Sequence, residues 1–317
     1  MKLAMAFIMD PLSGVDVDKD TTFVLMLEAQ RRGHEVWYLE PGAMFTGGST
    51  LYAMCSRVSL DRGGAPHYSV LESENRPLNS FDVVWMRKDP PFNMDYIYST
   101  YMLSLVREDG TLVINDPRGI RESNEKLYTL YFPEVIPETC VSKDKVRLKA
   151  FMEQAGGEIV IKPLHGCGGE GVFYLCAGDK NVNVIIEQIT QGGEVFVMAQ
   201  RYISEAAEGD KRIIILNGEP LGAVLRVSDP GDFRCNFHSG GRPVKTEMTE
   251  RDVEICEALA PRLKSDGLYF VGIDVIGGYL TEVNTTSPTG VQEINRLDGV
   301  ALESDVIDFV EGKCSKG

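Results

Sequence analysis

The 317-residue sequence lacks any CxxC pair, and its seven cysteines are scattered along the chain. A dispersed, odd set of cysteines does not suit a disulfide framework or a zinc site, and it is typical of reduced cytosolic thiols. Basic residues are also few, because 32 lysines and arginines stand against 47 acidic residues, giving a net charge of −15. This charge argues against nonspecific binding to nucleic acid or a membrane surface. No apolar run approaches the roughly 20 residues that a membrane-spanning helix needs.

The chain opens on an apolar segment that must be distinguished from a secretion signal. This run is short, and Asp10-Pro11 ends it without a small-residue cleavage site, so we predict a buried first strand. Short apolar strands that alternate with helices indicate βαβ units and a parallel sheet. In the first third we expect strands over residues 3–9, 35–39, 81–86 and 111–114, and helices over residues 20–32 and 98–108.

Two further features belong to this first third. Asp20 is the predicted N-cap of the first helix, and Gly33 is its predicted stop signal. Residues 41–80 are rich in glycine, serine and asparagine and show no clear period. We therefore predict a long irregular insertion there.

The pattern changes after about residue 122, where strands are expected to pair as hairpins. Asn217-Gly218 separates two apolar runs and is a strong turn signal. Thr249 and Asp252 form a capping-box pattern, which predicts a helix over residues 249–264 that ends at Gly267. Further strands are expected over residues 158–162, 172–175, 195–199, 212–216, 221–225, 269–276 and 280–284. This order indicates an α/β domain followed by an α+β region.

A glycine-rich loop holds Gly166, Gly168, Gly169 and Gly171 and has the dinucleotide spacing GxGxxG. That fingerprint requires a helix after the loop, whereas residues 172–175 are strand formers, which argues against an NAD-dependent oxidoreductase. No Gly-Lys-Ser/Thr follows, so the loop is not a P-loop either. A glycine loop between strands favours a flap that offers backbone N–H groups to phosphates. A plain tight hairpin is the alternative.

Lys162 lies in the apolar strand that leads into this loop. Lysine is rarely buried without a partner, and Pro163 leaves open an exposed position on an edge strand. A strand lysine before a phosphate flap instead supplies a point charge for a phosphate, and we favour this interpretation. Lys126 is a weaker candidate, because a lone lysine in that context is typical of a helix surface.

Asp274, Glu282 and Asn284 lie on the two strands of the last predicted hairpin. Because side chains alternate between faces, a three-residue turn would place Asp274 opposite Glu282, with Asn284 on the same face. A two-residue turn would put the carboxylates on opposite faces. The three-residue register also gathers on one core face Val271, Ile273, Val275, Thr281 and Val283, which favours it. Two carboxylates and an amide oxygen suit Mg²⁺, and a solvent-facing strand face is the alternative.

Arginines gather around one predicted hairpin despite the negative net charge. They are Arg212, Arg226, Arg234 and Arg242, the last two in a glycine-containing loop over residues 228–242. Arginine binds carboxylate and phosphate in a bidentate manner, so the cluster suggests an anionic ligand, although each alone is typical of a surface. Ligands of open α/β sheets gather at the carboxyl edge of the strands. At that predicted edge lie Asp10, Ser13 and Arg87.

Several of these segments together resemble one known family. They are Met86-Arg87-Lys88-Asp89-Pro90-Pro91-Phe92, Asn124-Glu125-Lys126, Ile161-Lys162-Pro163-Leu164, Gly209-Asp210-Lys211-Arg212, Val271-Gly272-Ile273-Asp274 and Thr281-Glu282-Val283-Asn284-x-x-Ser287-Pro288-Thr289. Their order and spacing resemble the bacterial glutathione synthetases of the ATP-grasp superfamily, from about residue 5 to about residue 310. The first and last segments together are specific to that family, whereas the lysines, flap and acidic hairpin alone indicate only ATP-grasp.

The resemblance implies an N-terminal (pre-ATP-grasp) α/β domain over residues 1–122, then a central ATP-grasp lobe over 123–202 and a C-terminal lobe over 203–317. It also implies a cytoplasmic homo-oligomer, either a dimer or a tetramer. It assigns to ATP the residues Lys126, Lys162, Gly166, Gly168, Gly169, Gln200, Tyr202, Ile203 and Asp210. It assigns to the substrates Asp10, Ser13, Arg87, Arg234, Gly240, Ser287 and Thr289. It assigns to Mg²⁺, or Mn²⁺ in its place, Asp274, Glu282 and Asn284.

The implied reaction joins γ-glutamylcysteine to glycine and converts ATP to ADP and phosphate through an acyl phosphate. Arg212 and Arg226 are the predicted catalytic residues, which would stabilise charge at the reacting centre. His165 and Cys167 stand where the resemblance leads us to expect Asp and Met, which affects the flap's dynamics more than its backbone N–H groups. The alternatives are an ATP-grasp ligase for another carboxylate–amine pair and a non-catalytic ATP-binding regulator. Retention of the acidic hairpin set argues against the regulator.

Overall fold

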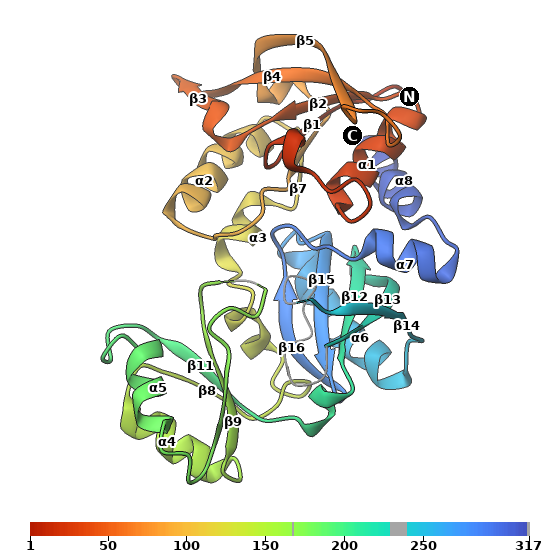
Figure 1. The fold of residues 1–317 in the computed structure, drawn as a ribbon. Coiled ribbons are helices and arrows are strands. Elements are labelled where there is room, and N and C mark those ends of the chain that lie inside the picture. The colour runs from red at the N-terminus through yellow and green to blue at the C-terminus, as the bar shows by residue number, and fades with distance from the viewer. Residues whose placement is uncertain (167, 229–239, 316–317) are drawn as a thin grey trace.

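The computed structural model describes residues 1–166, 168–228 and 240–315 and arranges their strands in three sheets (Figure 1). The first sheet has a parallel part in the order β2–β1–β6–β7. Its strands are β1 (Ala4–Ile8), β2 (Glu35–Leu39), β6 (Val83–Met86) and β7 (Leu112–Ile114), and its helices are α1 (Thr21–Arg31), α2 (Met94–Glu108) and α3 (Pro117–Glu122). The Asp20 side chain accepts a hydrogen bond from Phe23 N at 2.6 Å, which confirms the predicted N-cap. The predicted parallel α/β domain is therefore confirmed.

The prediction of an irregular insertion over residues 41–80 is wrong. This segment forms β3 (Met44–Gly47), β4 (Thr50–Leu60) and β5 (Tyr68–Pro77), which extend the first sheet as antiparallel strands beyond β2. A register shift between Arg57 and Val58 interrupts β4. The buried positions consequently change from odd residue numbers before the shift to even numbers after it. This change of phase hides the strand's alternation in the sequence.

The central sheet is antiparallel, in the order β10–β9–β11–β8. Its strands are β8 (Thr139–Ser142), β9 (Glu158–Pro163), β10 (Phe173–Cys176) and β11 (Val197–Arg201), and its helices are α4 (Lys145–Gln154) and α5 (Val182–Ile189). The helices bury Leu148 and Ile186 against Ile159 and Ile161 in a hydrophobic cluster of their own. The glycine-rich loop joins β9 to β10, so the predicted strand–loop–strand order is confirmed.

The third sheet has the order β14–β13–β12–β15–β16 and carries most of the candidate site residues. Its strands are β12 (Asp210–Leu216), β13 (Glu219–Val227), β14 (Arg242–Lys245), β15 (Phe270–Ile276) and β16 (Tyr279–Asn284). Helix α6 (Glu250–Ser265) opens with the predicted capping box between Thr249 and Asp252. Two more helices, α7 (Val291–Asp298) and α8 (Leu302–Cys314), follow, and short 3-10 helices include η1 (Leu12–Gly14), η2 (Pro41–Ala43), η3 (Leu78–Ser80), η4 (Leu127–Tyr131) and η5 (Ser204–Ala207).

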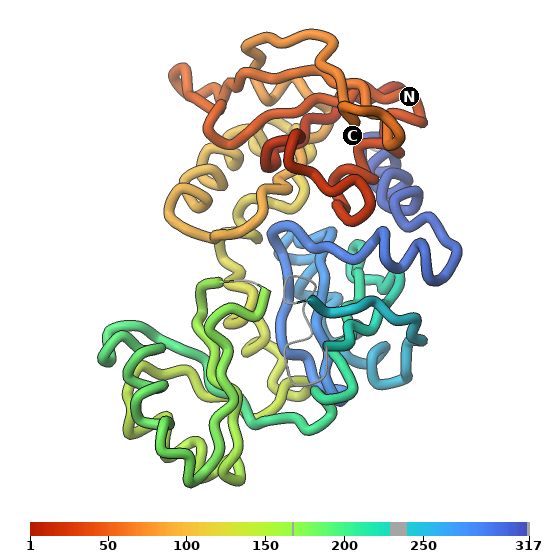
Figure 2. The backbone as a smooth tube through the Cα atoms, viewed as in Figure 1, coloured from red at the N-terminus to blue at the C-terminus, as the bar shows by residue number. Residues whose placement is uncertain are grey.

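The end of the chain returns to its beginning, so that α8 lies beside α1 (Figure 2). The Arg32 guanidinium forms ion pairs with Asp308 and Glu311 of α8, and the buried His34 ring contacts Glu311 at 2.8 Å. Two hydrophobic clusters combine side chains of the first and third sheets, whereas the central sheet has a separate cluster. Within the described residues, no helix is both long and apolar enough to cross a membrane.

Candidate functional site

Two cavities meet at the acidic hairpin β15–β16. One, which we call the nucleotide cavity after the ligand that the sequence predicts for it, measures about 130 Å³ and is lined by residues of the central and third sheets. The other, which we call the substrate cavity after the residues predicted for the substrates, measures about 740 Å³ and is lined by residues of the first and third sheets. Asp274, Glu282 and Gly168 line both cavities, so the hairpin forms part of a wall that the two cavities share.

All nine residues predicted for ATP line the nucleotide cavity. They are Lys126, Lys162, Gly166, Gly168, Gly169, Gln200, Tyr202, Ile203 and Asp210. Val160 and Ile276, which sequence reasoning did not single out, add apolar walls that suit a flat base. One oxygen of the buried Asp210 carboxylate has no hydrogen-bond partner, and burial raises the pKa of this group to about 6 although Arg226 opposes the effect. A buried acceptor left unused in this way is available to a ligand.

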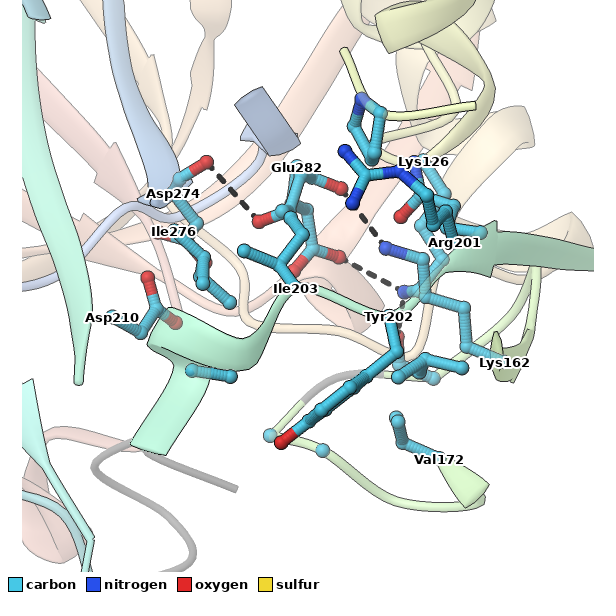
Figure 3. A pocket seen from close by; sticks show the side chains of 18 of the residues that line it. Lys126, Lys162, Val172, Arg201, Tyr202, Ile203, Asp210, Asp274, Ile276 and Glu282 are labelled. Atoms are coloured by element: carbon cyan, nitrogen blue, oxygen red, sulfur yellow. Dashed lines mark hydrogen bonds and ion pairs between the residues drawn. The ribbon is translucent and has the colours of Figure 1, made fainter. Parts of the chain in front are cut away.

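The two lysines of the nucleotide cavity converge on strand β16 (Figure 3). Lys126 Nζ lies 2.9 Å from Glu282 Oε1 and donates a hydrogen bond to the Gly166 carbonyl at 3.0 Å. Lys162 Nζ donates to the Thr281 carbonyl at 3.0 Å. Strand β9 lies inside its sheet, and Lys162 is only 8% exposed, so the edge-strand alternative for this lysine is excluded. Lys126 is likewise buried, unlike a typical helix-surface lysine.

Burial lowers the pKa of Lys162 to about 8, because the charged ammonium loses its hydration. A bound phosphate favours the charged form, so nucleotide binding should take up a proton. We expect the KM for ATP to rise as the pH is raised from 7 to 9, since only about one tenth of the lysine stays charged one unit above its pKa. Steady-state kinetics across this range would measure the effect. Lys162→Met should show a high KM for ATP with a flat profile, and a flat profile in the unaltered protein would contradict the assignment.

The acidic hairpin has the predicted pairing but not the predicted turn. Asp274 lies opposite Glu282, as expected, yet Ile276 pairs with Tyr279 across a two-residue turn of Gly277 and Gly278, both with positive φ. A register shift after Asp274 compensates, because it leaves Thr281 as the extra residue of the returning strand. The shift also corrects the predicted core face. Leu280 is fully buried, whereas Thr281 is partly exposed and lines the nucleotide cavity.

The residues predicted for a metal are a fitting set of donors. Asp274, Glu282 and Asn284 all line the substrate cavity. The Asn284 amide nitrogen donates to the Gly272 carbonyl at 3.2 Å, which reserves its side-chain oxygen for another contact. Two carboxylates and one amide oxygen are hard ligands that suit a divalent cation such as Mg²⁺. In the described part of the chain, no group of three His, Cys, Asp or Glu residues is arranged for a metal, so phosphates and water would have to complete the shell.

The predicted catalytic arginines cross the face of the third sheet beside Asp274. Arg212 lies opposite Asp274 in the register, and its Nε and Nη2 atoms donate to the carboxylate at 2.6 and 3.2 Å. Arg226 lies opposite Asp210, forms an ion pair with it, and lies 3.0 Å from Asp274 Oδ2. Burial acts to raise the pKa of Asp274, but the two guanidinium groups outweigh burial and hold this pKa low. The result is a buried, ionised carboxylate that fixes two cations at the junction of both cavities.

The substrate cavity brings together most residues predicted for the substrates. Asp10, Ser13, Arg87, Ser287 and Thr289 line it. Arg87 is 4% exposed and donates to Thr22 Oγ1 at 3.0 Å and to the Pro288 carbonyl at 2.9 Å. Burial lowers the pKa of this guanidinium, and no carboxylate of the described residues forms an ion pair with it. A buried cation of this kind needs an anion, and an open cavity lets a ligand supply it.

Some predicted residues are not part of this arrangement. Gly240 is exposed and lines neither cavity. Arg234 and Cys167 lie outside the described residues. Among the polar residues that line the substrate cavity and that sequence reasoning left unassigned are Thr22, Glu125, Thr286 and Glu293. Of these four, Glu125 carried a signal, because it stands inside the Asn124-Glu125-Lys126 segment.

The chain matches two family models. The N-terminal domain of prokaryotic glutathione synthetase matches residues 3–121, and its ATP-grasp domain matches residues 125–299. Among curated relatives, the glutathione synthetase of Thermosynechococcus vestitus is 50% identical over 315 residues, covering 96% of this chain and 99% of the relative. That of Coxiella burnetii is 44% identical over 314 residues and covers 99% of this chain and 98% of the relative.

Solved structures share the fold at much lower identity. The D-cycloserine synthetase DcsG superimposes with a TM-score of 0.67 at 15% identity, covering 99% of both chains. The ATP-grasp ligase PsnB, complexed with a minimal precursor, Mg and ADP, gives a TM-score of 0.62 at 16% identity and covers 98% of both chains. These structures therefore share the overall fold of nearly the whole chain.

Proposed function

Because this chain belongs to the prokaryotic glutathione synthetase family, we propose that it joins γ-glutamylcysteine to glycine with ATP, giving glutathione, ADP and phosphate. The observation that carries the proposal is the row of Arg212, Asp274 and Glu282 across three adjacent strands. On one side of this row lies the nucleotide cavity with its lysines, and on the other lies the substrate cavity with Arg87. A phosphate and a carboxylate would meet there.

The chemistry requires a dipeptide carboxylate to approach the γ-phosphate, although both are anions. Lys126 and Lys162 would hold the phosphates, and Arg212 and Arg226 would face the carboxylate and the oxyanion that forms when the amine attacks. A divalent cation held by Asp274, Glu282 and Asn284 would supply further neutralisation of phosphate charge. The flap between β9 and β10 would exclude water, which would otherwise hydrolyse an acyl phosphate.

We extend the proposal to Mg²⁺ as the cation, with Mn²⁺ as a substitute, and to a cytoplasmic homo-oligomer. The hard oxygen donors support the choice of metal. The free thiols of the described cysteines are consistent with a reducing compartment. The oligomer rests on family membership alone, and light scattering on the purified protein would determine whether it is a dimer or a tetramer.

Phosphate release from MgATP tests the proposed function directly. The assay compares γ-glutamylcysteine alone, glycine alone, both together, and pairs that contain D-alanine. We expect release to require γ-glutamylcysteine and glycine together, with glutathione as the product. Turnover only with another acid and amine would retain the ATP-grasp mechanism but overturn the substrate assignment. ATP binding without turnover of any pair would favour the regulator.

Arg87 gives a second test, specific to the acid substrate. Arg87→Lys keeps the positive charge but loses the planar fork that contacts Thr22 and Pro288 while facing the cavity. We expect the KM for γ-glutamylcysteine to rise at least ~10-fold, which corresponds to the loss of one charge-assisted hydrogen bond, with little change in the KM for ATP. The matched control is Arg118→Lys, at an arginine whose side chain is 75% exposed. An unchanged KM for the dipeptide would contradict the role of Arg87.

A further inference from the structure

Glu125 makes an unusual set of contacts for a residue that faces a substrate cavity. Its Oε1 atom accepts three hydrogen bonds, from Thr285 N at 3.0 Å, Thr286 N at 3.3 Å and Thr286 Oγ1 at 2.9 Å. Its backbone carbonyl accepts a fourth, from Val283 N at 2.9 Å. These donors surround Asn284 in the sequence. Glu125 therefore holds the chain on both sides of a candidate metal ligand.

The chain held in this way continues directly into the substrate cavity. We call residues 285–290 the exit loop, because they leave strand β16 and lead to α7. Farther along this loop, Arg87 donates to the Pro288 carbonyl at 2.9 Å and Arg212 donates to the Thr289 carbonyl at 3.0 Å. The start of the exit loop is thus fixed by Glu125, and its later part is fixed by two arginines of the candidate site.

The two neighbours of Glu125 contact the segment that leads into the flap. Asn124 Nδ2 donates to the Leu164 carbonyl at 3.0 Å, and Lys126 Nζ donates to the Gly166 carbonyl at 3.0 Å. Both acceptors lie where strand β9 passes into the glycine-rich flap. Three consecutive residues therefore join the base of the flap to the acidic hairpin and the exit loop.

A charged carboxylate at this position costs free energy that a neutral side chain would not. Burial raises the pKa of Glu125, and the nearby charge of Glu282 raises it further. The three hydrogen-bond donors that contact Oε1 offset part of this cost. They do not require a charged acceptor, because any acceptor oxygen that reaches them can take their hydrogen bonds. The reach of the side chain is then the property that matters, and it depends on side-chain length. Aspartate is one methylene shorter than glutamate, whereas glutamine is the same length and keeps an acceptor oxygen.

We propose that Glu125 is a positioning residue for the ligation reaction, which sets the exit loop and Asn284 relative to the flap. This inference rests on the proposed function. Glu125 acts through Asn284 and through the cavity-lining Ser287 and Thr289, so its alteration should change the use of the dipeptide more than the stability of the fold.

The test compares Glu125→Asp with Glu125→Gln in the full-length protein. We expect Glu125→Asp to raise the KM for γ-glutamylcysteine at least ~10-fold, because its acceptor no longer reaches the exit loop, and Glu125→Gln to stay within ~3-fold of the unaltered protein. The matched control is Glu28→Asp, which shortens a buried glutamate of α1 that pairs with Arg31 and Arg32. That control should alter the melting temperature without altering the KM.

Each result bears on a separate claim. If the unaltered protein does not join γ-glutamylcysteine to glycine, the proposed function fails, and the role of Glu125 fails with it. If the unaltered protein is active but Glu125→Asp changes only the melting temperature, Glu125 is merely structural and the inference is overturned. A larger defect in Glu125→Gln than in Glu125→Asp would also overturn it, because charge and not reach would then be the decisive property.

Discussion

Replacing Asp274 with asparagine is expected to lower kcat roughly 10²- to 10³-fold, a loss typical of removing one electrostatic group from a reacting centre. The carboxylate holds Arg212 by two hydrogen bonds and lies 3.0 Å from the Arg226 guanidinium. Burial acts to raise its pKa, yet the two arginines keep this pKa low, so the group is ionised throughout the neutral range. Asparagine has nearly the same shape but no charge, so it neither anchors both arginines nor binds a cation well.

The control for this prediction is another buried carboxylate that pairs with a basic side chain of β12. Asp252 is 2% exposed and contacts Lys211 Nζ at 2.5 Å, on a strand residue next to Arg212. It lines neither cavity. Asp252→Asn should lower the melting temperature but change kcat by no more than ~3-fold, since it removes a capping and pairing contact only. A kcat for Asp274→Asn within ~5-fold of the unaltered protein would exclude Asp274 from the chemistry.

The acidic hairpin shows what alternation along a sequence can and cannot predict. The prediction that Asp274 lies opposite Glu282 follows because side chains alternate between the two faces of a strand and the apolar ones must share one core face. The same pattern allowed two ways to achieve it, either a three-residue turn or a two-residue turn with a bulge. Two glycines that both adopt positive φ favour the short turn, and the bulge then moves Leu280 into the core. A bulge leaves no residue-type signature here, so the sequence did not show that a two-residue turn could also keep the two carboxylates opposite each other.

Local sequence patterns predicted which charged residues belong to the candidate site. They did not predict the residues that those charged residues contact. The flap, Lys162 and the hairpin set were all visible as departures from ordinary strand composition. The resemblance included Glu125, but not its proposed role, because that role depends on Thr285 and Thr286, about 160 residues away in the sequence. Strand β4 was missed for a related reason, since its bulge reverses the burial phase within a single strand. Contacts between distant segments and single-residue register shifts are both set by tertiary packing.

Replacing Arg226 with methionine should destabilise the protein and also reduce its activity. Arg226 is 2% exposed and lies between the carboxylates of Asp210 and Asp274, with an ion pair to each. Burial alone would lower the pKa of this guanidinium, but the two carboxylates raise it, so it is always charged. Its removal leaves the buried Asp210 carboxyl beside Asp274 without its cation, so Asp210 must either bind a proton or stay as an unpaired charge. We expect the free energy of unfolding to fall by about 3–5 kcal/mol, measured by denaturant titration, and kcat to fall ~10²-fold.

A double variant separates these two effects. Asp210→Asn combined with Arg226→Met removes both members of the buried pair, so Asp274 keeps its contact with Arg212 and the charge of Asp210 is no longer beside it. Most of the lost stability should return, because replacing both partners is far less costly than leaving one charge unpaired. The activity should stay low if Arg226 stabilises charge in the reaction. Recovery of kcat together with stability would instead show that Arg226 serves only to neutralise the two aspartates, leaving Arg212 as the arginine that acts on the substrate.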